Sequence, residues 1–317
     1  MTKMNLILGT ITFGQQTFDE DAAVMIDTAL KNGIKELDTA YVYNEGECER
    51  VLGRVLAPLE RGSYRLAIKA NPRITGRLDR AAIFTQVNES LERLGTDRAE
   101  LLYLHFPDRH VPLREQLQAC NDLYNEGKIE ALGLSNYSEQ LIDEAVSIAR
   151  DNGWLVPTVY EGVYNALSRR VEENLFECLR RNDMRFTAYN PLAGGILTGK
   201  YTDVDEAPKD GRFVKRASYK ARYWHKEFFD AAALIRKACD DAGITMVEAA
   251  LRWLASHSML DAKEGDAIII GASRPDQLLQ NIDCVNAGPL PASVSEAIDK
   301  AWPVCKSVAP EYFKYIT

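Results

Sequence analysis

Three strand-like segments end in residues that together could deliver a proton to an oxygen atom. Asp38, Lys69 and His105 stand at or beside the ends of the second, third and fourth segments, and Tyr43 follows Asp38 by five residues. Free tyrosine, with a pKa near 10, is a reluctant acid at neutral pH. We therefore expect Lys69 to lower the pKa of Tyr43, and Asp38 to hold Lys69 charged and in place. His105 is expected to donate a hydrogen bond to a carbonyl oxygen and orient the substrate.

Each of these residues also has an ordinary structural interpretation. Lys69 alone is compatible with a surface lysine, Asp38 with a turn or helix cap, and His105 with a buried, hydrogen-bonded core histidine. The functional interpretation is favoured because these polar residues fall at the ends of separate strands and would converge at one place. The set contains neither a nucleophile nor a cluster of metal ligands. It predicts polarisation and protonation of an oxygen, as in carbonyl reduction by a hydride donor bound alongside.

Eight short strand-like segments alternate with helical ones along the chain. Strands are predicted over residues 6–8, 35–37, 66–69, 101–105, 131–134, 158–160, 186–189 and 267–270. Helices are predicted over residues 19–32, 79–94, 112–126, 138–152, 171–182, 227–242, 275–286 and 293–302. This alternation implies parallel strands, in a doubly wound sheet or a closed barrel, and the count of eight favours a (β/α)8 TIM barrel. Without an internal repeat or a linker, residues 1–317 are expected to form a single domain.

Composition narrows the class of protein further. A net charge of −8 lacks the basic footprint of a protein that binds nucleic acid or an anionic membrane. The apolar runs are short and the first residues lead directly into a strand, so a cytoplasmic location is expected. The cysteines lie far apart without a CxxC pair, and we expect mostly buried thiols in the reduced state. They are Cys48, Cys120, Cys178, Cys239, Cys284 and Cys305.

A long segment over residues 192–225 follows the seventh predicted strand and is expected to be a functional loop. No GxGxxG motif follows a strand, which argues against a Rossmann dinucleotide site. Gly194 and Gly199-Lys200 match part of a phosphate-binding loop, but Tyr201 stands where Ser or Thr should bind magnesium, so a nucleoside triphosphatase is rejected. The same glycines could still lie against a pyrophosphate. Lys200, Arg212 and Arg274 are candidates for a 2′-phosphate, with ordinary surface positions as the alternative.

Several motifs in order resemble the aldo-keto reductase family, and the resemblance covers nearly the whole chain. Residues 37–43, LDTAYVY, with Gly46 and Leu52-Gly53, are similar to the family signature. Residues 103–108, YLHFPD, residues 133–137, GLSNY, and residues 188–200, AYNPLAGGILTGK, are more specific. They resemble the branch that contains aflatoxin-aldehyde and succinic semialdehyde reductases.

The resemblance implies an NADP(H)-dependent reduction of aldehydes or ketones. Tyr43 would be the proton donor, Lys69 the group that lowers its pKa, Asp38 the partner of Lys69, and His105 the residue that orients the substrate. Tyr219 and Arg222 match positions that face the substrate in this branch, where homodimers are common. Around the cofactor, the resemblance implies contacts to the nicotinamide carboxamide, the nicotinamide ring, the pyrophosphate and the 2′-phosphate end. The residues implied are Ser135, Asn136, Glu161, Tyr189, Asn190, Leu192, Gly194, Lys200, Arg212, Ser273, Arg274, Gln277 and Asn281.

The sequence departs from this branch at two places, and it is compatible with one rival function. Glu161 stands where the branch carries a glutamine beside the carboxamide, and residues 9–14 lack the methionines common there. Glu161 would favour the oxidised, cationic nicotinamide if it is ionised, and would mimic glutamine if it is protonated. Arg222 is expected to pair with a substrate carboxylate. The rival is a non-catalytic NADP(H)-binding subunit, because barrels of this family also serve as cytosolic β subunits of channels.

Overall fold

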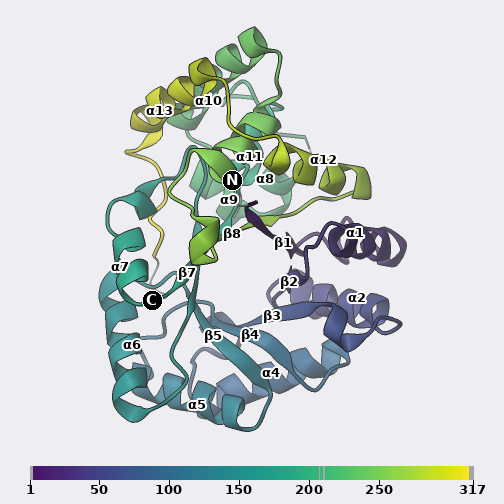
Figure 1. Cartoon of the computed structure of the whole chain (residues 1–317), viewed down its shortest axis with the longest axis vertical. Coiled ribbons are helices and arrows are strands. Elements are labelled where there is room, and N and C mark those ends of the chain that lie inside the picture. The colour runs from purple at the N-terminus through teal and green to yellow at the C-terminus, as the bar shows by residue number, and fades with distance from the viewer. Residues whose placement is uncertain (1–2, 207, 210, 314–317) are drawn as a thin grey trace.

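Eight parallel strands close into a barrel that helices surround. The computed structural model describes residues 3–206, 208–209 and 211–313, with Lys215 described by its backbone alone. Strands pair in the order β1 to β8, and β8 pairs with β1 to close the barrel. Figure 1 shows α1 and α2 on one side of the strands, α4 and α5 on a second, and α6 and α7 on a third. The predicted (β/α)8 barrel is confirmed.

The elements alternate as the sequence predicts. The strands are β1 Asn5–Gly9, β2 Glu36–Asp38, β3 Arg65–Ala70, β4 Ala99–Leu104, β5 Ile129–Ser135, β6 Val159–Val163, β7 Arg185–Tyr189 and β8 Ala267–Ile270. The α-helices are α1 Asp19–Lys31, α2 Glu47–Leu56, α3 Pro72–Thr75, α4 Arg80–Leu94, α5 Leu113–Asn125, α6 Glu139–Asn152, α7 Leu175–Arg181, α8 Arg212–Lys215, α9 Ala217–Tyr223, α10 Lys226–Ala242, α11 Met246–Ser256, α12 Pro275–Asn286 and α13 Ala292–Cys305. Short 3-10 turns are η1 Asn44–Gly46, η2 Arg61–Ser63, η3 Arg170–Glu172, η4 Ala193–Thr198 and η5 Ala262–Glu264.

Helix ends follow local chemistry. The side chain of Asp79 accepts a hydrogen bond from the backbone N–H of Ala82 and caps α4, which ends at Gly95 in the left-handed conformation. Thr245 caps α11 in the same way, through the N–H of Glu248. These caps place α4 and α11 with their apolar faces against the core that surrounds the barrel.

Inward-pointing side chains set up the site, because alternate residues of a strand face the same side of a sheet. Ala67, Leu101, Tyr103 and Val159 form a small apolar cluster separate from the core that the helices cover. Two residues beyond Ala67, Tyr103 and Val159, toward the carboxyl ends of the strands, come Lys69, His105 and Glu161. The apolar layer of the barrel therefore lies directly beneath a layer of titratable side chains.

Where the structure differs from the predicted elements, the difference has a local cause. The segment over residues 192–225 is not a helix-free loop, since it contains η4, α8 and α9. The helix predicted over residues 171–182 is split, because Asn174 has non-helical backbone angles between η3 and α7. Strand β6 runs three residues further than predicted, to Val163. The apolar helix α11 and the motif-bearing helix α2 were not predicted.

The outer elements complete the fold. Helices α10 and α13 pack against each other beyond the barrel, as Figure 1 shows. Tyr160 donates a hydrogen bond to the backbone carbonyl of Tyr312, which ties the segment after α13 to β6. All six cysteines are free and buried, which confirms the expectation of buried thiols. Within the described part of the chain, no helix combines the length and apolar character needed to cross a membrane.

Candidate functional site

A cavity of about 690 Å³ opens at the carboxyl ends of the barrel strands. Its size lies in the range of small-molecule and cofactor sites, and its position is the one where barrels of this type carry their active sites. Nearly all the predicted site residues line it, while Lys69 lies beneath its floor. The lining residues among them are Asp38, Tyr43, His105, Ser135, Asn136, Glu161, Tyr189, Asn190, Leu192, Gly194, Lys200, Arg212, Tyr219, Arg222, Ser273, Gln277 and Asn281.

Lys69 forms the centre of a buried ion cluster. Its Nζ atom contacts Asp38 and lies 2.8 Å from Oε2 of Glu161. The Lys69 side chain has no exposed surface and the two carboxylates are only 4% exposed. Burial alone would lower the pKa of Lys69, but the charges of Asp38 and Glu161 outweigh it, and the net shift is upward. The predicted pairing of Asp38 with a charged Lys69 is confirmed, and Glu161 is a second partner that was not foreseen.

The pKa of Tyr43 moves in the direction opposite to the one expected. Burial raises it well above its ordinary value, and the carboxylates of Asp38 and Glu161 raise it further. Lys69 is occupied by those two carboxylates, and its Nζ lies 5.9 Å from the centre of the Tyr43 ring. The net shift is upward even with the ammonium nearby, and a lowering of this pKa by Lys69 stays a prediction. Tyr43 is a neutral phenol across the physiological range.

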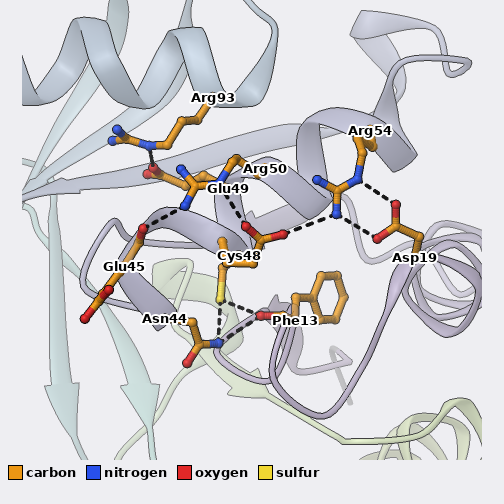
Figure 2. A network of polar contacts seen from close by, with 10 residues as sticks. Phe13, Asp19, Asn44, Glu45, Cys48, Glu49, Arg50, Arg54 and Arg93 are labelled. Atoms are coloured by element: carbon orange, nitrogen blue, oxygen red, sulfur yellow. Dashed lines mark hydrogen bonds and ion pairs between the residues drawn. The ribbon is translucent and has the colours of Figure 1, made fainter.

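The segment that follows Tyr43 is anchored by side-chain hydrogen bonds, and Figure 2 shows those from Asn44 and Cys48 to Phe13. The Asn44 side-chain amide donates hydrogen bonds to the backbone carbonyls of Phe13, at 2.9 Å, and Ile11, at 3.2 Å. The Cys48 thiol donates to the same Phe13 carbonyl at 3.0 Å. These bonds hold Tyr43 over the barrel although Asn44 has a positive φ of 54°, a conformation that asparagine tolerates better than most residues.

His105 is held in one tautomer by Asn71. The Oδ1 atom of Asn71 accepts a hydrogen bond from the backbone N–H of Arg73 at 3.0 Å, so the other end of the amide is the NH₂ group. That group lies 3.2 Å from Nδ1 of His105 and donates to it. The imidazole proton is therefore on Nε2, which has no partner among the described residues. Burial, together with Lys69 and Arg73, holds the pKa of His105 well below its usual range, so the ring is neutral.

Asparagine amides on the opposite side of the cavity are arranged for a polar ligand. Asn136 donates to the backbone carbonyl of His105 at 2.8 Å and to Oγ of Ser135 at 3.0 Å. Oδ1 of Asn190 accepts from the Tyr219 hydroxyl at 3.1 Å. The Nδ2 atom of Asn190 is buried and has no partner in the described part of the chain. An unpaired buried donor is costly unless a ligand supplies its acceptor.

Positive charge collects around the rim of the cavity. Arg73, Lys200, Arg212, Arg216 and Arg222, referred to below as the mouth cations, all line the cavity. Among the described residues, none of them forms an ion pair with a carboxylate, and the only carboxylates that line the cavity belong to the Lys69 cluster.

The mouth cations rest instead on aromatic or neutral groups. Arg212 and Arg222 lie 5.0 and 5.8 Å from the centre of the Tyr219 ring, and Arg216 donates to Oδ1 of Asn44 at 3.0 Å. The guanidinium groups therefore keep donors that an anionic ligand could use.

One predicted cofactor residue lies apart from this group. Arg274 is exposed, pairs with Asp276 at 3.1 Å and does not line the cavity. The lining residues that sequence reasoning missed include Asn71, Arg73 and Arg216. The Asn-Pro pair at residues 71–72 is a helix-start signal that points to a capping role for Asn71, but nothing in the sequence links that cap to His105.

Comparison with known proteins agrees with this geometry. The pattern of the aldo/keto reductase family matches residues 5–303. "Aflatoxin B1 aldehyde reductase member 2" of Rattus norvegicus is 41% identical over 97% of this chain and 87% of its own length. Human "Aldo-keto reductase family 7 member A3" is 40% identical over 97% of this chain and 96% of its own. An aldo-keto reductase of Pseudocercospora fijiensis is 36% identical over 91% and 100%.

These relatives confirm the branch that the motifs resemble, and they make the chain an oxidoreductase. The match extends from the first strand to the last helix of the barrel, so it covers every element that positions the site. This chain belongs to the aldo/keto reductase family.

Proposed function

We propose that this protein reduces aldehydes or ketones to alcohols with NADPH, and that Tyr43 supplies the proton. The observation that carries the proposal is a pair of neutral donors in one cavity. The Tyr43 hydroxyl and His105 Nε2 both lack hydrogen-bond partners among the described residues, and their rings lie edge to face with centres 6.5 Å apart. A carbonyl oxygen placed between them would accept from both.

The residues present fit a phosphorylated dinucleotide. The mouth cations supply charge for its phosphates, and the unpaired Nδ2 of Asn190 supplies a buried donor. Gly194 and Gly195 have φ values of 68° and 124°, and a Cβ on Gly194 would lie 2.8 Å from the Tyr223 ring, so this turn needs glycine. Ser135, Asn136, Glu161 and Tyr189 would hold the nicotinamide, as the family resemblance implies. When bound, NADPH supplies a hydride to the carbonyl carbon.

The protein's own residues then complete the reduction. Hydride addition turns the carbonyl oxygen into an alkoxide, which is much more basic than a phenolate, so Tyr43 gives up its proton despite its raised pKa. The proton moves from the Tyr43 hydroxyl to that oxygen and the alcohol forms. His105 holds the oxygen through its Nε2–H, and Asn71 keeps that proton on Nε2. The Lys69 cluster positions the phenol from beneath the floor.

Further expectations go with this proposal. Tyr219 and Arg222 are proposed to contact the substrate, with Arg222 pairing with a carboxylate. Closure of the barrel by β8 on β1 supports assignment of residues 1–317 to one domain. A cytoplasmic location and a homodimer stay predictions.

Replacing Tyr43 with Phe tests the proposal, because it removes the proton donor and leaves the ring. Turnover of 4-nitrobenzaldehyde with NADPH should fall by a factor of about 10² to 10⁴, while NADPH binding measured by fluorescence persists. Retention of more than half of the wild-type turnover, with chemistry rate-limiting, would show that Tyr43 is not the acid. A wild-type protein that binds NADPH but consumes none with any carbonyl would favour the non-catalytic subunit.

A further inference from the structure

Arg73 is an exposed arginine at the edge of the cavity that has no acidic partner among the described residues. The next two arginines along the chain behave differently. Arg77 pairs with Asp79 at 2.6 Å, and Arg80 pairs with Asp122 at 3.2 Å. Arg73 lines the cavity, whereas Arg77 and Arg80 do not. Its guanidinium donors are therefore available to a ligand in the cavity.

Arg73 is also fixed in position relative to the reacting atoms. Its guanidinium carbon lies 4.5 Å from the centre of the Phe106 ring, and that ring stacks on His105 with centres 5.1 Å apart. Its backbone N–H donates to Asn71, whose amide donates in turn to His105. The charge of Arg73 reaches the imidazole, because burial, Lys69 and Arg73 together lower the pKa of His105. A group bound at Arg73 is thus held at a defined distance from the carbonyl site.

The residues around Arg73 belong to the substrate side of the cavity. Arg73, Asn71 and Phe106 follow β3 and β4, whereas the proposed cofactor residues lie within or after β5 to β8. Arg222, the other candidate for substrate contact, comes from α9 within the long segment after β7. The two arginines therefore reach the mouth from different parts of the barrel.

We propose that Arg73 forms a second anion-binding position for the substrate, so that the site prefers carbonyl compounds that carry two anionic groups. This inference rests on the proposed function. One anionic group would pair with Arg222 and the other with Arg73, where planar guanidinium donors match the oxygens of a carboxylate or a phosphate monoester. Phe106 would hold the guanidinium plane in place while the anion binds.

Matched substrates and variants test the proposal. Benzaldehyde, 4-carboxybenzaldehyde and 5-formylbenzene-1,3-dicarboxylate carry no, one and two anions, and glyceraldehyde compared with its 3-phosphate tests a phosphate. Arg73→Ala should lower kcat/KM for both substrates, and the loss for the dicarboxylate should be about 10- to 100-fold larger than the loss for benzaldehyde. Arg80→Ala is the matched control, because Arg80 also lies over a phenyl ring, that of Phe84 at 4.0 Å, but outside the cavity. It should leave the ratios unchanged.

Equal losses for all the aldehydes in Arg73→Ala would overturn the proposal, because they would mean that Arg73 acts only through His105. Arg222→Ala and the double variant should show whether the two anion positions contribute independently. An unchanged melting temperature checks that Arg73→Ala is folded, and Arg73→Lys should recover part of the preference.

Anion binding without turnover separates this inference from the proposed function. Titration of isophthalate and inorganic phosphate into NADP⁺-saturated protein should give about tenfold weaker binding for Arg73→Ala than for wild type. Weaker binding of either anion to Arg73→Ala supports the proposal and identifies the kind of anion that binds. If both anions bind the variant as tightly as the wild type, the proposal is overturned. If the wild type reduces no carbonyl, the proposed function fails while this titration still decides the role of Arg73.

Discussion

Two groups of cationic side chains in this barrel stand in opposite electrostatic surroundings. Around α2, Arg50, Arg54 and Arg93 pair with Glu47, Asp19 and Glu49 at 2.6–2.8 Å, and Figure 2 shows this network. The mouth cations pair with no acid among the described residues, although the chain carries a net charge of −8. Acids are abundant, so their absence from the rim is a property of that surface.

The difference separates charges that stabilise the fold from charges that await a ligand. An arginine with a buried acid partner contributes to folding stability through that pair, because its loss leaves a buried carboxylate without a compensating charge. An arginine without one can be replaced with little effect on folding but a large effect on binding. The Lys69 cluster combines both properties, because it is fully paired and also lies beneath the reacting groups.

Replacing Lys69 with Met should have the largest effect. Two buried carboxylates would lose the cation that pairs with them among the described residues, which should lower the free energy of unfolding by about 3–5 kcal/mol at pH 7. Burial already raises the pKa of Asp38 and Lys69 opposes that rise, so without the ammonium the pKa of Asp38 in the folded state should move further above its unfolded value. The loss of unfolding free energy relative to wild type should therefore shrink as the pH falls and grow as the pH rises. Urea unfolding at pH 5 and pH 8 measures this, and a pH-independent loss would contradict it.

Within the α2 network, burial should decide the size of the effect. Glu49 is fully buried and burial raises its pKa, which Arg93 partly offsets. Arg93→Met should therefore cost about 2–4 kcal/mol of unfolding free energy. Arg54→Ala, which breaks two exposed pairs, with Asp19 and Glu47, should cost less than about 1 kcal/mol. Both should leave kcat/KM for benzaldehyde within about twofold of wild type. Similar losses of stability for the two variants would show that burial does not govern this network.

Asn71→Asp should change the pH dependence of catalysis. A carboxylate beside Nδ1 of His105 would stabilise the imidazolium and raise a pKa that is now well below its usual range. We expect kcat/KM to fall by about tenfold and to acquire an ionisation between about pH 6 and 9 that the wild type lacks. Nitrogen NMR of the imidazoles, with only four histidines in the chain, reports the tautomer directly. An unchanged pH profile would reduce Asn71 to a helix cap.

The sequence predicts the barrel and the convergence of Asp38, Lys69 and His105, because both depend on strand alternation and chain order. It does not predict the upward shift in the pKa of Tyr43, which comes first from burial and then from the carboxylates of Asp38 and Glu161. Lys69 and Glu161 belong to β3 and β6, which are not neighbours in the barrel, so no local pattern joins them. Helix α11 was missed although its buried residues Met246, Ala249 and Trp253 recur at helical spacing, so a local pattern was present there.

Glu161→Gln should change binding less than the other variants change stability or catalysis. It tests a charge that is paired beneath the cavity, in contrast to the unpaired mouth cations. In the wild type Glu161 shares Lys69 with Asp38, so only part of its negative charge acts on a nearby nicotinamide. We expect the variant to lose about 3- to 10-fold in affinity for NADP⁺ relative to NADPH, measured by fluorescence titration of both forms at pH 7.

A second readout of Glu161→Gln does not depend on cofactor affinity. Glu161 is among the charges that raise the pKa of Tyr43, after burial and Asp38, so removing it should lower that pKa. The reverse reaction, alcohol oxidation, needs the phenolate as a base, and its rise with pH should therefore move to lower pH in the variant. A shift in the pH profile with an unchanged affinity ratio would mean that Glu161 acts on Tyr43 alone. If neither changes, Glu161 has no electrostatic role in the reaction and serves only to hold Lys69 in place.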